Sequence, residues 1–225
     1  LAFDLCVALS ATKRKAELQC QNLKALRYKL KSDSQVLQDG GYGAGSKVFK
    51  SEFRAVKHII RWGISSHSKA RMLFQLIRFF NPERVLELGT SIGLTTLYLA
   101  SAQYPRPVHS VEANAAYFEF AKRLHAQHNS KLNILFFHST FETFFNANPG
   151  VYDFIFIDGW HSVNQVLIDW EYSSLLSDNG IVGFHDTSCH PGPVKFVEAL
   201  DRDKWVVEEN VCPDDHGIGF AWKKS

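Results

Sequence analysis

The sequence has few cysteines, a single methionine and no long block of like charge. The cysteines are Cys6, Cys20, Cys189 and Cys212. They form no CxxC pair and are too scattered for a disulfide framework, and the neighbouring His190 and His216 complete no zinc template. Reduced cysteines of this kind are typical of a cytoplasmic protein. With 25 basic and 23 acidic residues the net charge is only +2, and the absence of a clustered basic face disfavours a nucleic-acid partner.

Long apolar runs are also absent, so we expect no membrane span. The apolar opening stretch, residues 1–10, is followed rather than preceded by basic residues, which is the reverse of a signal peptide. The 225 residues are 45% hydrophobic and 13% aromatic, which is ample material for a core. This length suits one compact α/β domain with an appendage.

Residues 1–80 read as an N-terminal helical extension. Leucines at spacings of three and four among many lysines and arginines predict one or two amphipathic helices over residues 3–31. We expect them to pack on the main domain or on a second subunit of a homodimer, with a membrane-surface helix as the alternative. The glycine-rich loop at 39–46 is either a lid or a plain linker. Residues 67–80 then predict an amphipathic helix that ends at an Asn-Pro pair.

Residues 81–225 show alternating strand and helix patterns. Strands are expected at 84–88, 108–111, 133–137, 151–157 and 180–184, and helices at 94–101, 115–127, 141–146, 163–176 and 194–200. Two further strands, 205–208 and 218–222, follow one another without a helix between them. Regular alternation predicts a Rossmann-like α/β fold, a mostly parallel sheet covered on both faces and ending in an antiparallel hairpin.

The first turn of this part is Glu-Leu-Gly-Thr-Ser-Ile-Gly, from Glu87 to Gly93, and it lies where open α/β sheets bind ligands. A dinucleotide site needs G-x-G-x-x-G. Here Thr90 and Ser91 separate Gly89 from the next glycine, and Glu87 would repel a pyrophosphate. Its carboxylate suits a ligand with an amino group and a positive centre instead. The alternative is a strand-to-helix turn that merely needs glycine.

A second carboxylate, Glu112, ends the next strand, followed by Ala113. An acidic side chain in this place can accept both hydroxyls of a ribose. A ribose and a cation without a phosphate describe S-adenosylmethionine.

The stretch Val85-Leu-Glu-Leu-Gly-Thr-Ser-Ile-Gly-Leu-Thr-Thr-Leu-Tyr-Leu-Ala100 resembles the first motif of the class I S-adenosylmethionine-dependent methyltransferases, in their O-methyltransferase branch. The resemblance extends from Arg84 to the end of the chain, and it implies a seven-stranded sheet with an antiparallel hairpin. It also implies a set of cofactor-binding residues. These are Glu87, Gly89, Thr90, Ser91, Gly93, Glu112, Ala113, Thr140, Phe141, Asp158 and Trp160.

Acidic and imidazole side chains follow the fourth and fifth strands of the predicted sheet. Asp158 ends one strand, and His185 and Asp186 end the next. If these strands are neighbours, the two carboxylates converge and either share a proton or bind a hard cation such as Mg²⁺, or Mn²⁺, which tolerates a histidine better. We therefore treat Asp158, Asp186 and His185 as candidate metal ligands. The alternative is a helix cap and a loop hydrogen bond.

Two branches of the family are similar at this point. Catechol-type O-methyltransferases have Asp-x-Trp-Lys, in which the aspartate binds metal, the tryptophan flanks the adenine and the lysine takes the substrate proton. Sugar and macrolide O-methyltransferases have Asp-x-x-His. By this resemblance Asp158, Trp160 and His161 form the site, with His161 as the catalytic base beside Asp158. The chain departs from the catechol branch at Thr187, where that branch has Asn, and from the sugar branch at His185, where that branch has Glu.

Taken together, the sequence predicts S-adenosylmethionine-dependent O-methylation of a small hydroxylated molecule, with metal assistance as an added feature. A non-catalytic S-adenosylmethionine-binding protein remains an alternative. An NAD-dependent oxidoreductase is disfavoured by the missing second glycine. A nucleic-acid amino-methyltransferase would need Asn/Asp-Pro-Pro-Tyr where this chain has Asp-Gly-Trp-His.

Overall fold

The computed structural model describes residues 2–40, 52–147, 150–159, 175–187, 191–209 and 217–224. The N-terminal part consists of helices and one small hairpin. Its elements are α1 (Ala2–Gln19), α2 (Gln21–Leu30), β1 (Val36–Gln38), β2 (Phe53–Ala55), α3 (Val56–Trp62) and α4 (His67–Phe80). β1 and β2 pair as a separate two-stranded antiparallel sheet.

The rest of the described chain alternates strands and helices. Its strands are β3 (Val85–Leu88), β4 (Val108–Glu112), β5 (Ile134–His138), β6 (Tyr152–Ile157), β7 (Leu176–His185), β8 (Trp205–Glu208) and β9 (Ile218–Lys223). Its helices are α5 (Leu94–Gln103), α6 (Ala115–Asn129), α7 (Phe141–Ala147) and α9 (Pro191–Ala199).

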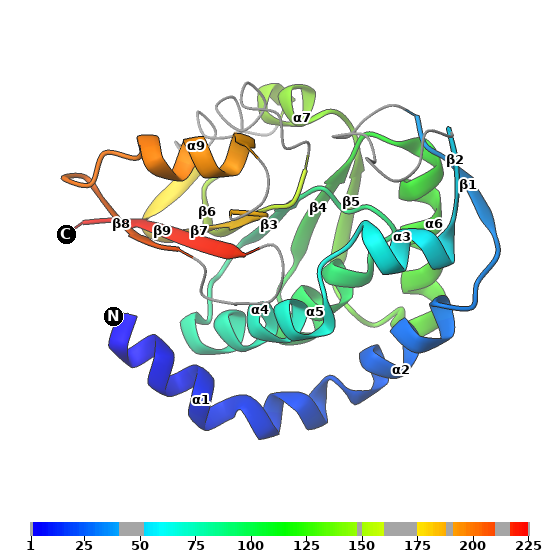
Figure 1. Ribbon diagram of the computed structural model, residues 1–225, viewed down its shortest axis with the longest axis horizontal. Helices are drawn as coiled ribbons and strands as arrows, with labels where there is room; N and C mark the ends of the chain where they lie inside the picture. Colours follow the sequence, from blue (N-terminus) through cyan, green and yellow to red (C-terminus); the bar gives the residue numbers. More distant parts are fainter. Residues whose placement is uncertain are drawn as a thin grey trace.

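The seven strands form one sheet in the order β5-β4-β3-β6-β7-β9-β8 (Figure 1). The first five run parallel, and β9 pairs antiparallel with both β7 and β8. The chain builds outward from β3 to β5, then returns to place β6 on the other side of β3. The switch point therefore lies between the carboxyl ends of β3 and β6. This topology confirms the predicted Rossmann-like fold with an antiparallel C-terminal hairpin.

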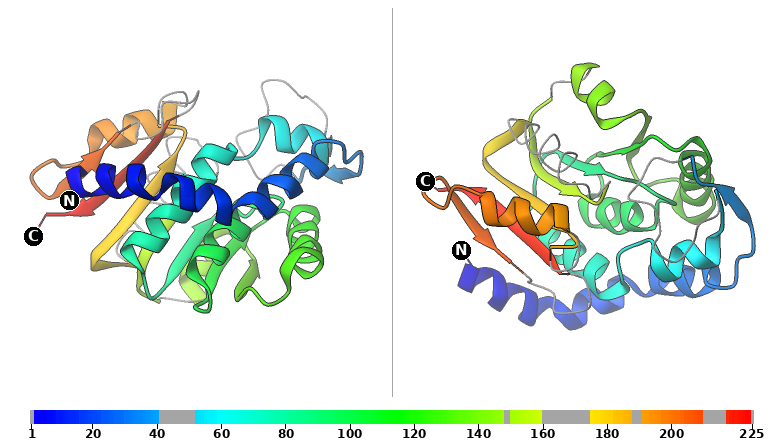
Figure 2. Two further views of the ribbon diagram at one scale, coloured as in Figure 1. Left: turned by 90° about the horizontal axis from the view of Figure 1, so that it is seen from below. Right: turned by 45° about the horizontal axis from the view of Figure 1, so that its top comes forward.

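Side chains that alternate along the central strands fill two cores. On one face, Phe154 and Phe156 of β6 pack with the helices α1, α2, α4, α5 and α6. On the other face, Ile155 and Ile157 pack with α7 and α9. Figure 2 shows these two layers on either side of the sheet. Because both faces of the sheet are covered, the central strand β6 is almost continuously apolar, as is usual for strands of parallel sheets.

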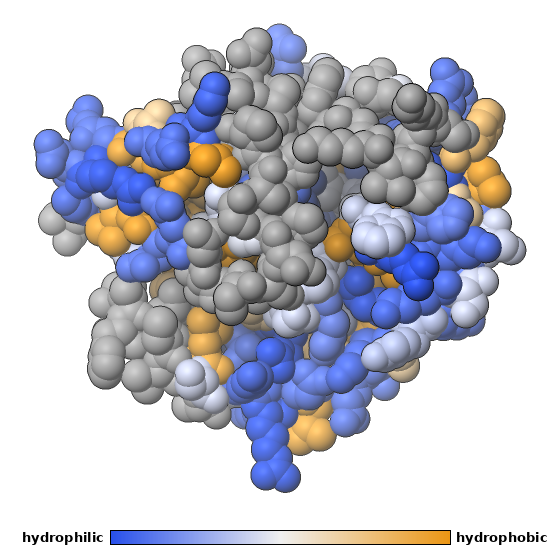
Figure 3. All heavy atoms as spheres, in the orientation of Figure 1, coloured by the Kyte–Doolittle hydropathy of each residue, from blue (hydrophilic) through white to orange (hydrophobic). Residues whose placement is uncertain are grey.

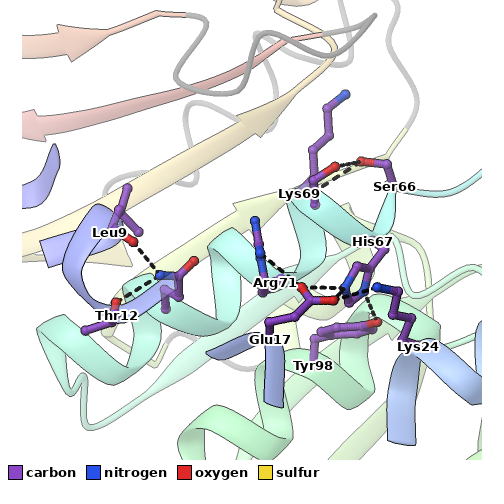
Figure 4. A network of polar contacts seen from close by, with 11 residues as sticks. Leu9, Thr12, Glu17, Lys24, Ser66, His67, Lys69, Arg71 and Tyr98 are labelled. Carbon is purple, nitrogen blue, oxygen red and sulfur yellow. Dashed lines mark hydrogen bonds and ion pairs between the residues drawn. The ribbon is translucent and has the colours of Figure 1, made fainter. Parts of the chain in front are cut away.

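The helices α1 and α2 lie along α4 and α5 of the same chain (Figure 1). Glu17 of α1 is the centre of their polar contacts: Lys24 lies at 2.6 Å, Arg71 at 3.0 Å and His67 at 3.2 Å (Figure 4). Lys24, the nearest, contributes most to a lowered pKa of Glu17. The other ring nitrogen of His67 lies 2.8 Å from the hydroxyl of Tyr98 on α5. This network fixes the N-terminal helices to the sheet domain.

Most predicted elements are present within one or two residues, and the helix at His67–Phe80 has its predicted bounds. Two local predictions need correction. Leu176 was assigned to the end of a helix but begins β7, and the β1–β2 hairpin was not anticipated. Of the glycine-rich loop, residues 41–46 lie outside the described part. The division of the chain near residue 80 stays a prediction.

No described helix is long and apolar enough to cross a membrane. On the face shown in Figure 3, apolar side chains of the described residues form small separate patches among hydrophilic ones. The predicted homodimer through the N-terminal helices stays a prediction.

Candidate active site

The turn between β3 and α5 lies at the switch point of the sheet. Three of its residues have positive φ: Gly89 at 103°, Ser91 at 49° and Gly93 at 81°. A Cβ on Gly89 would collide with the backbone carbonyl of Asp158, and one on Gly93 would collide with Ala121 of α6. Both glycines are therefore required, one for the close approach of β3 to the end of β6 and one for the packing of α5 on α6.

Glu112, at the end of β4, is only 8% exposed and is held by the backbone. Its Oε2 accepts a hydrogen bond from the Ser91 N–H at 2.7 Å, and its Oε1 accepts one from the Asn114 N–H at 2.8 Å. Burial raises the pKa of Glu112 to about 7, and these backbone donors oppose that effect. Each carboxylate oxygen keeps acceptor capacity for a further donor. The geometry fits a carboxylate that binds the two hydroxyls of a ribose.

Glu87 lies beneath the turn and is fully buried. Its Oε2 accepts hydrogen bonds from Thr96 at 2.5 Å and Ser110 at 2.6 Å, while its Oε1 has no partner among the described residues. Burial, and to a smaller extent the charges of Asp158 and Glu112, raise the pKa of Glu87 to about 8, although the two hydroxyls oppose this. An orphaned buried oxygen next to the switch point fits a site that a cationic ligand completes.

The other described cofactor candidates lie along the same edge. Thr90 is buried, with its hydroxyl 2.6 Å from that of Ser110. The carbonyl of Ala113 lies 3.1 Å from a ring nitrogen of the histidine that ends β5. Thr140 is exposed and caps the first turn of α7. The Phe141 ring occupies the space that a side chain on residue 159 would need, so it borders the end of β6.

The predicted acidic pair meets at the ends of β6 and β7. His185 Nδ1 lies 3.0 Å from Asp158 Oδ1 and 2.9 Å from Asp186 Oδ1, so one imidazole bridges both carboxylates. Asp186 has a φ of 61°, a left-handed conformation that aspartate tolerates better than most residues. The sequence therefore identified three side chains that the fold brings together.

Burial opposes a charge on His185, but Asp158 and Asp186 outweigh it and raise the pKa of His185 to about 10. The two contacts of Nδ1 are ion-pair contacts and not hydrogen bonds of good geometry.

Two members of this site were missed by the sequence analysis, and both come from the start of α4. The hydroxyl of Ser65 donates to Asp158 Oδ2 at 3.3 Å. Lys69 is 2% exposed, and its Nζ lies 3.4 Å from His185 Nε2. The N-cap serine of α4, Ser66, could have placed Lys69 in the first turn of the predicted helix. Nothing in the sequence spacing indicated that this turn faces β7.

The predicted metal ligands Asp158, Asp186 and His185 lie close together, with His185 Nδ1 3.0 Å from Asp158 Oδ1 and 2.9 Å from Asp186 Oδ1. The opposite ring nitrogen faces Lys69. Within the described ranges, no group of three His, Cys, Asp or Glu side chains could hold a metal ion. The geometry therefore does not support the predicted Mg²⁺ or Mn²⁺.

The predicted base His161 and the predicted adenine contact Trp160 lie outside the described residues, which end at Gly159 and resume at Leu175. Their roles stay predictions. Cys189, His190, Cys212 and His216, which were considered for zinc, also lie outside the described residues.

Residues 86–187 match the model of a family described as a methyltransferase domain. No protein with a curated description matches the chain. The match contains the glycine turn, Glu112 and the cluster at the ends of β6 and β7. Residues 86–187 are thus a methyltransferase domain, which confirms the resemblance seen in the sequence.

Solved methyltransferase structures share this architecture. A methyltransferase from Podospora anserina, PaMTH1 bound to SAH, is 17% identical, with a TM-score of 0.62 over 72% of this chain and 80% of that one. The O-methyltransferase TomG of Streptomyces achromogenes, in complex with SAM and involved in tomaymycin synthesis, is 18% identical, with a TM-score of 0.61 over 72% and 82%. An O-methyltransferase from Bacillus cereus in complex with SAH is 19% identical, with a TM-score of 0.59 over 72% and 84%. At these identities the likeness shows the fold.

Proposed function

We propose that the protein transfers the methyl group of S-adenosylmethionine to a hydroxyl of a small molecule. The observation that carries this proposal is Glu112, whose two carboxylate oxygens are oriented by the N–H groups of Ser91 and Asn114 at the end of β4. A carboxylate fixed in this way, beside a glycine turn that lacks the G-x-G-x-x-G spacing of a dinucleotide site, is suited to the ribose of this cofactor.

The charge of the site supports the same donor. Glu112 and Asp158 lie close enough to Glu87 for their charges to raise its pKa, and a bound cation would favour the ionised form of all three. Such an acidic edge favours a ligand with a sulfonium and an ammonium group. The TomG structure holds SAM and the Bacillus cereus structure holds SAH, and both proteins are named O-methyltransferases. Hydroxyl methylation is the chemistry that we carry over from them.

In the proposed reaction the acceptor oxygen attacks the methyl carbon in line with the sulfonium. The O–CH₃ bond forms while the S–CH₃ bond breaks, S-adenosylhomocysteine leaves, and the hydroxyl proton passes to His161, the proposed base. We assign Asp158, which accepts a hydrogen bond from Ser65 and lies 3.0 Å from His185, to the acceptor side of the crevice. The sulfonium already activates the methyl group, so orientation and electrostatics are the protein's main contribution.

Replacing Glu112 with alanine tests the cofactor site. Loss of a charged acceptor should cost roughly 1.5–3 kcal/mol, which weakens cofactor affinity about 10- to 150-fold. Isothermal calorimetry with S-adenosylmethionine and with S-adenosylhomocysteine measures this effect. Glu119→Ala is the matched control, because Glu119 is an exposed acidic residue on the nearby helix α6.

The same titration separates the alternatives. If the parent protein binds NADH but neither adenosyl compound, it is an oxidoreductase and the proposal is wrong. If it binds S-adenosylmethionine but transfers no methyl group to any of a panel of hydroxylated acceptors, it is a binding protein. The cytoplasmic location stays a prediction.

A further inference from the structure

The small hairpin β1–β2 is docked on the first turn of α6 (Figure 1). The side chain of Asn114 makes the polar part of this contact. Its Nδ2 donates to the carbonyl of Gln38 in β1 at 3.0 Å, and its Oδ1 accepts the N–H groups of Ala116 and Tyr117 at the start of α6. One amide therefore caps the helix and holds the hairpin at the same time.

Asn114 is also one of the two residues that orient Glu112. Its backbone N–H donates to Glu112 Oε1 at 2.8 Å. The direction of this N–H depends on the backbone conformation of residue 114, which the side-chain contacts to α6 and to Gln38 fix from two sides. Because Asn114 is buried, losing one of these contacts would leave a polar group unpaired. Two hydrogen bonds in series thus connect the hairpin to the proposed ribose carboxylate.

A largely buried ion pair joins the two strands of the hairpin next to Gln38. Nη2 of Arg54, in β2, lies 2.5 Å from Oδ2 of Asp39, which directly follows β1. Strands of three residues are too short to stay paired on their own, so this ion pair and the burial of Leu37 stabilise the hairpin. Apolar contacts alone could do so without the cost of burying two charges.

The place of this ion pair relative to Glu112 gives the two charges a further role. Burial is the main cause of the raised pKa of Glu112, and the negative charge of Asp39 adds to it, so the two carboxylates lie within reach of one another. Arg54 compensates the charge of Asp39. A lone carboxylate in the same place would disfavour the ionised form of Glu112 more strongly. The pair therefore holds the hairpin beside the ribose carboxylate without adding a net charge there.

We propose that the β1–β2 hairpin belongs to the cofactor site, and that through Asn114 it sets the orientation in which Glu112 accepts the ribose hydroxyls of S-adenosylmethionine. Asn114, Asp39 and Arg54 are positioning residues, because they act on the ligand through Glu112. The inference rests on the proposed function, in which Glu112 binds the ribose. It adds that two strands outside the segment that matches the family, residues 86–187, determine how well this ribose is recognised.

The preference for a ribose over a deoxyribose is the quantity to measure. Calorimetry gives the affinities for S-adenosylhomocysteine and for its 2′-deoxyribosyl analogue, and their ratio reports on one ribose hydroxyl. The parent protein should prefer S-adenosylhomocysteine by about tenfold or more, because the hydroxyl that the analogue lacks donates to a charged acceptor. Glu112→Ala should bind the two compounds within about twofold of each other, since the acceptor is gone.

Asn114→Ser separates the hairpin contact from the helix cap. Serine still caps α6 and keeps the backbone N–H, but it lacks the amide that reaches Gln38. The preference for the ribose should fall by about threefold or more, whereas a merely structural effect would weaken the binding of both compounds by the same factor. Asn133→Ser is the matched control, because Asn133 likewise donates its amide to a backbone carbonyl, that of Pro105 at 3.2 Å, just before β5. It should keep the preference of the parent.

The double variant Asp39→Asn, Arg54→Gln removes the ion pair without leaving a lone charge. It should lower the preference in the same way, and it decides the question where Asn114→Ser fails to fold. If Glu112→Ala loses the preference but a folded hairpin variant of either kind keeps it, the inference is overturned and the proposed function stands.

Failure of the proposed function would look different. A parent protein that binds neither S-adenosylmethionine nor S-adenosylhomocysteine refutes the methyltransferase chemistry. A parent that binds S-adenosylhomocysteine and the deoxyribosyl analogue equally well refutes the role of Glu112, and the inference about the hairpin with it.

Discussion

Replacing Glu87 with glutamine should make the protein more stable at neutral and alkaline pH. Burial raises the pKa of Glu87 from 4.5 to about 8 in the folded protein. Between these values the folded state keeps a proton that the unfolded chain has lost, so stability falls as pH rises through this window. One pKa unit corresponds to about 1.4 kcal/mol, so the whole window accounts for roughly 5 kcal/mol at most.

Glutamine is neutral at every pH and keeps a carbonyl oxygen to accept the hydrogen bonds of Thr96 and Ser110. The variant should therefore lack this part of the pH dependence. Urea unfolding followed by tryptophan fluorescence, from about pH 5 to about pH 8.5, gives the free energy of unfolding of both proteins. The pKa of Glu112 is also raised, to about 7, so the free energy of unfolding of both proteins falls with pH for this second reason. The difference in free energy between the parent and Glu87→Gln therefore reports on Glu87 alone.

The exposed residue Glu119 offers the control, since Glu119→Gln should leave the pH dependence unchanged. Equal slopes for the parent and Glu87→Gln would refute the reasoning, because Glu87 would then titrate alike in both states. A constant loss of stability at all pH values would indicate that Glu87 is ionised in the folded protein and paired with a cation.

Two further predictions concern the turn and the base. Gly89→Ala places a Cβ against the backbone of Asp158 at a φ of 103°, so it should lower stability by about 1–3 kcal/mol and weaken S-adenosylhomocysteine binding. Gly63→Ala, at a φ of −123°, should cost less in the same unfolding assay. His161→Ala should lower kcat by about 10²–10⁴ without changing cofactor affinity, and parent activity should rise with pH through about 6–7. Full activity of the His161 variant would assign the proton to another group.

The sequence predicted the elements that carry a strong local pattern. The helix His67–Phe80 has buried residues at helical spacing, and its last turn ends at Asn81 in the left-handed conformation, just before a proline. The strands Val85–Leu88 and Tyr152–Ile157 are continuous apolar runs, as expected when both faces are covered. β1 and β2 were missed because three-residue strands with one buried residue or none carry too short a pattern to recognise.

Only those residues of the candidate site that directly follow a strand could be predicted from the sequence. Asp158, His185 and Asp186 follow the fourth and fifth strands, so the parallel sheet brings them together. Residue types alone could not show that one ring nitrogen of His185 would lie about equally close to both carboxylates. Ser65 contacts Asp158 across 93 positions of sequence, and Lys69 contacts His185 across 116. Contacts of that range depend on how α4 packs, which the sequence pattern does not specify.

The N-terminal helices and the acidic edge are parts of one structure. Arg27 of α2 is buried, and its guanidinium donates to the carbonyl of Ser65, whose hydroxyl donates to Asp158. Lys69 reaches the same edge from the next turn of chain. Both Ser65 and Lys69 precede the segment that matches the methyltransferase family, residues 86–187. The segment before residue 86 therefore orients the carboxylate of Asp158, which lies within the methyltransferase domain. Differences between relatives in that segment would change the site even where the residues of the shared motifs are the same.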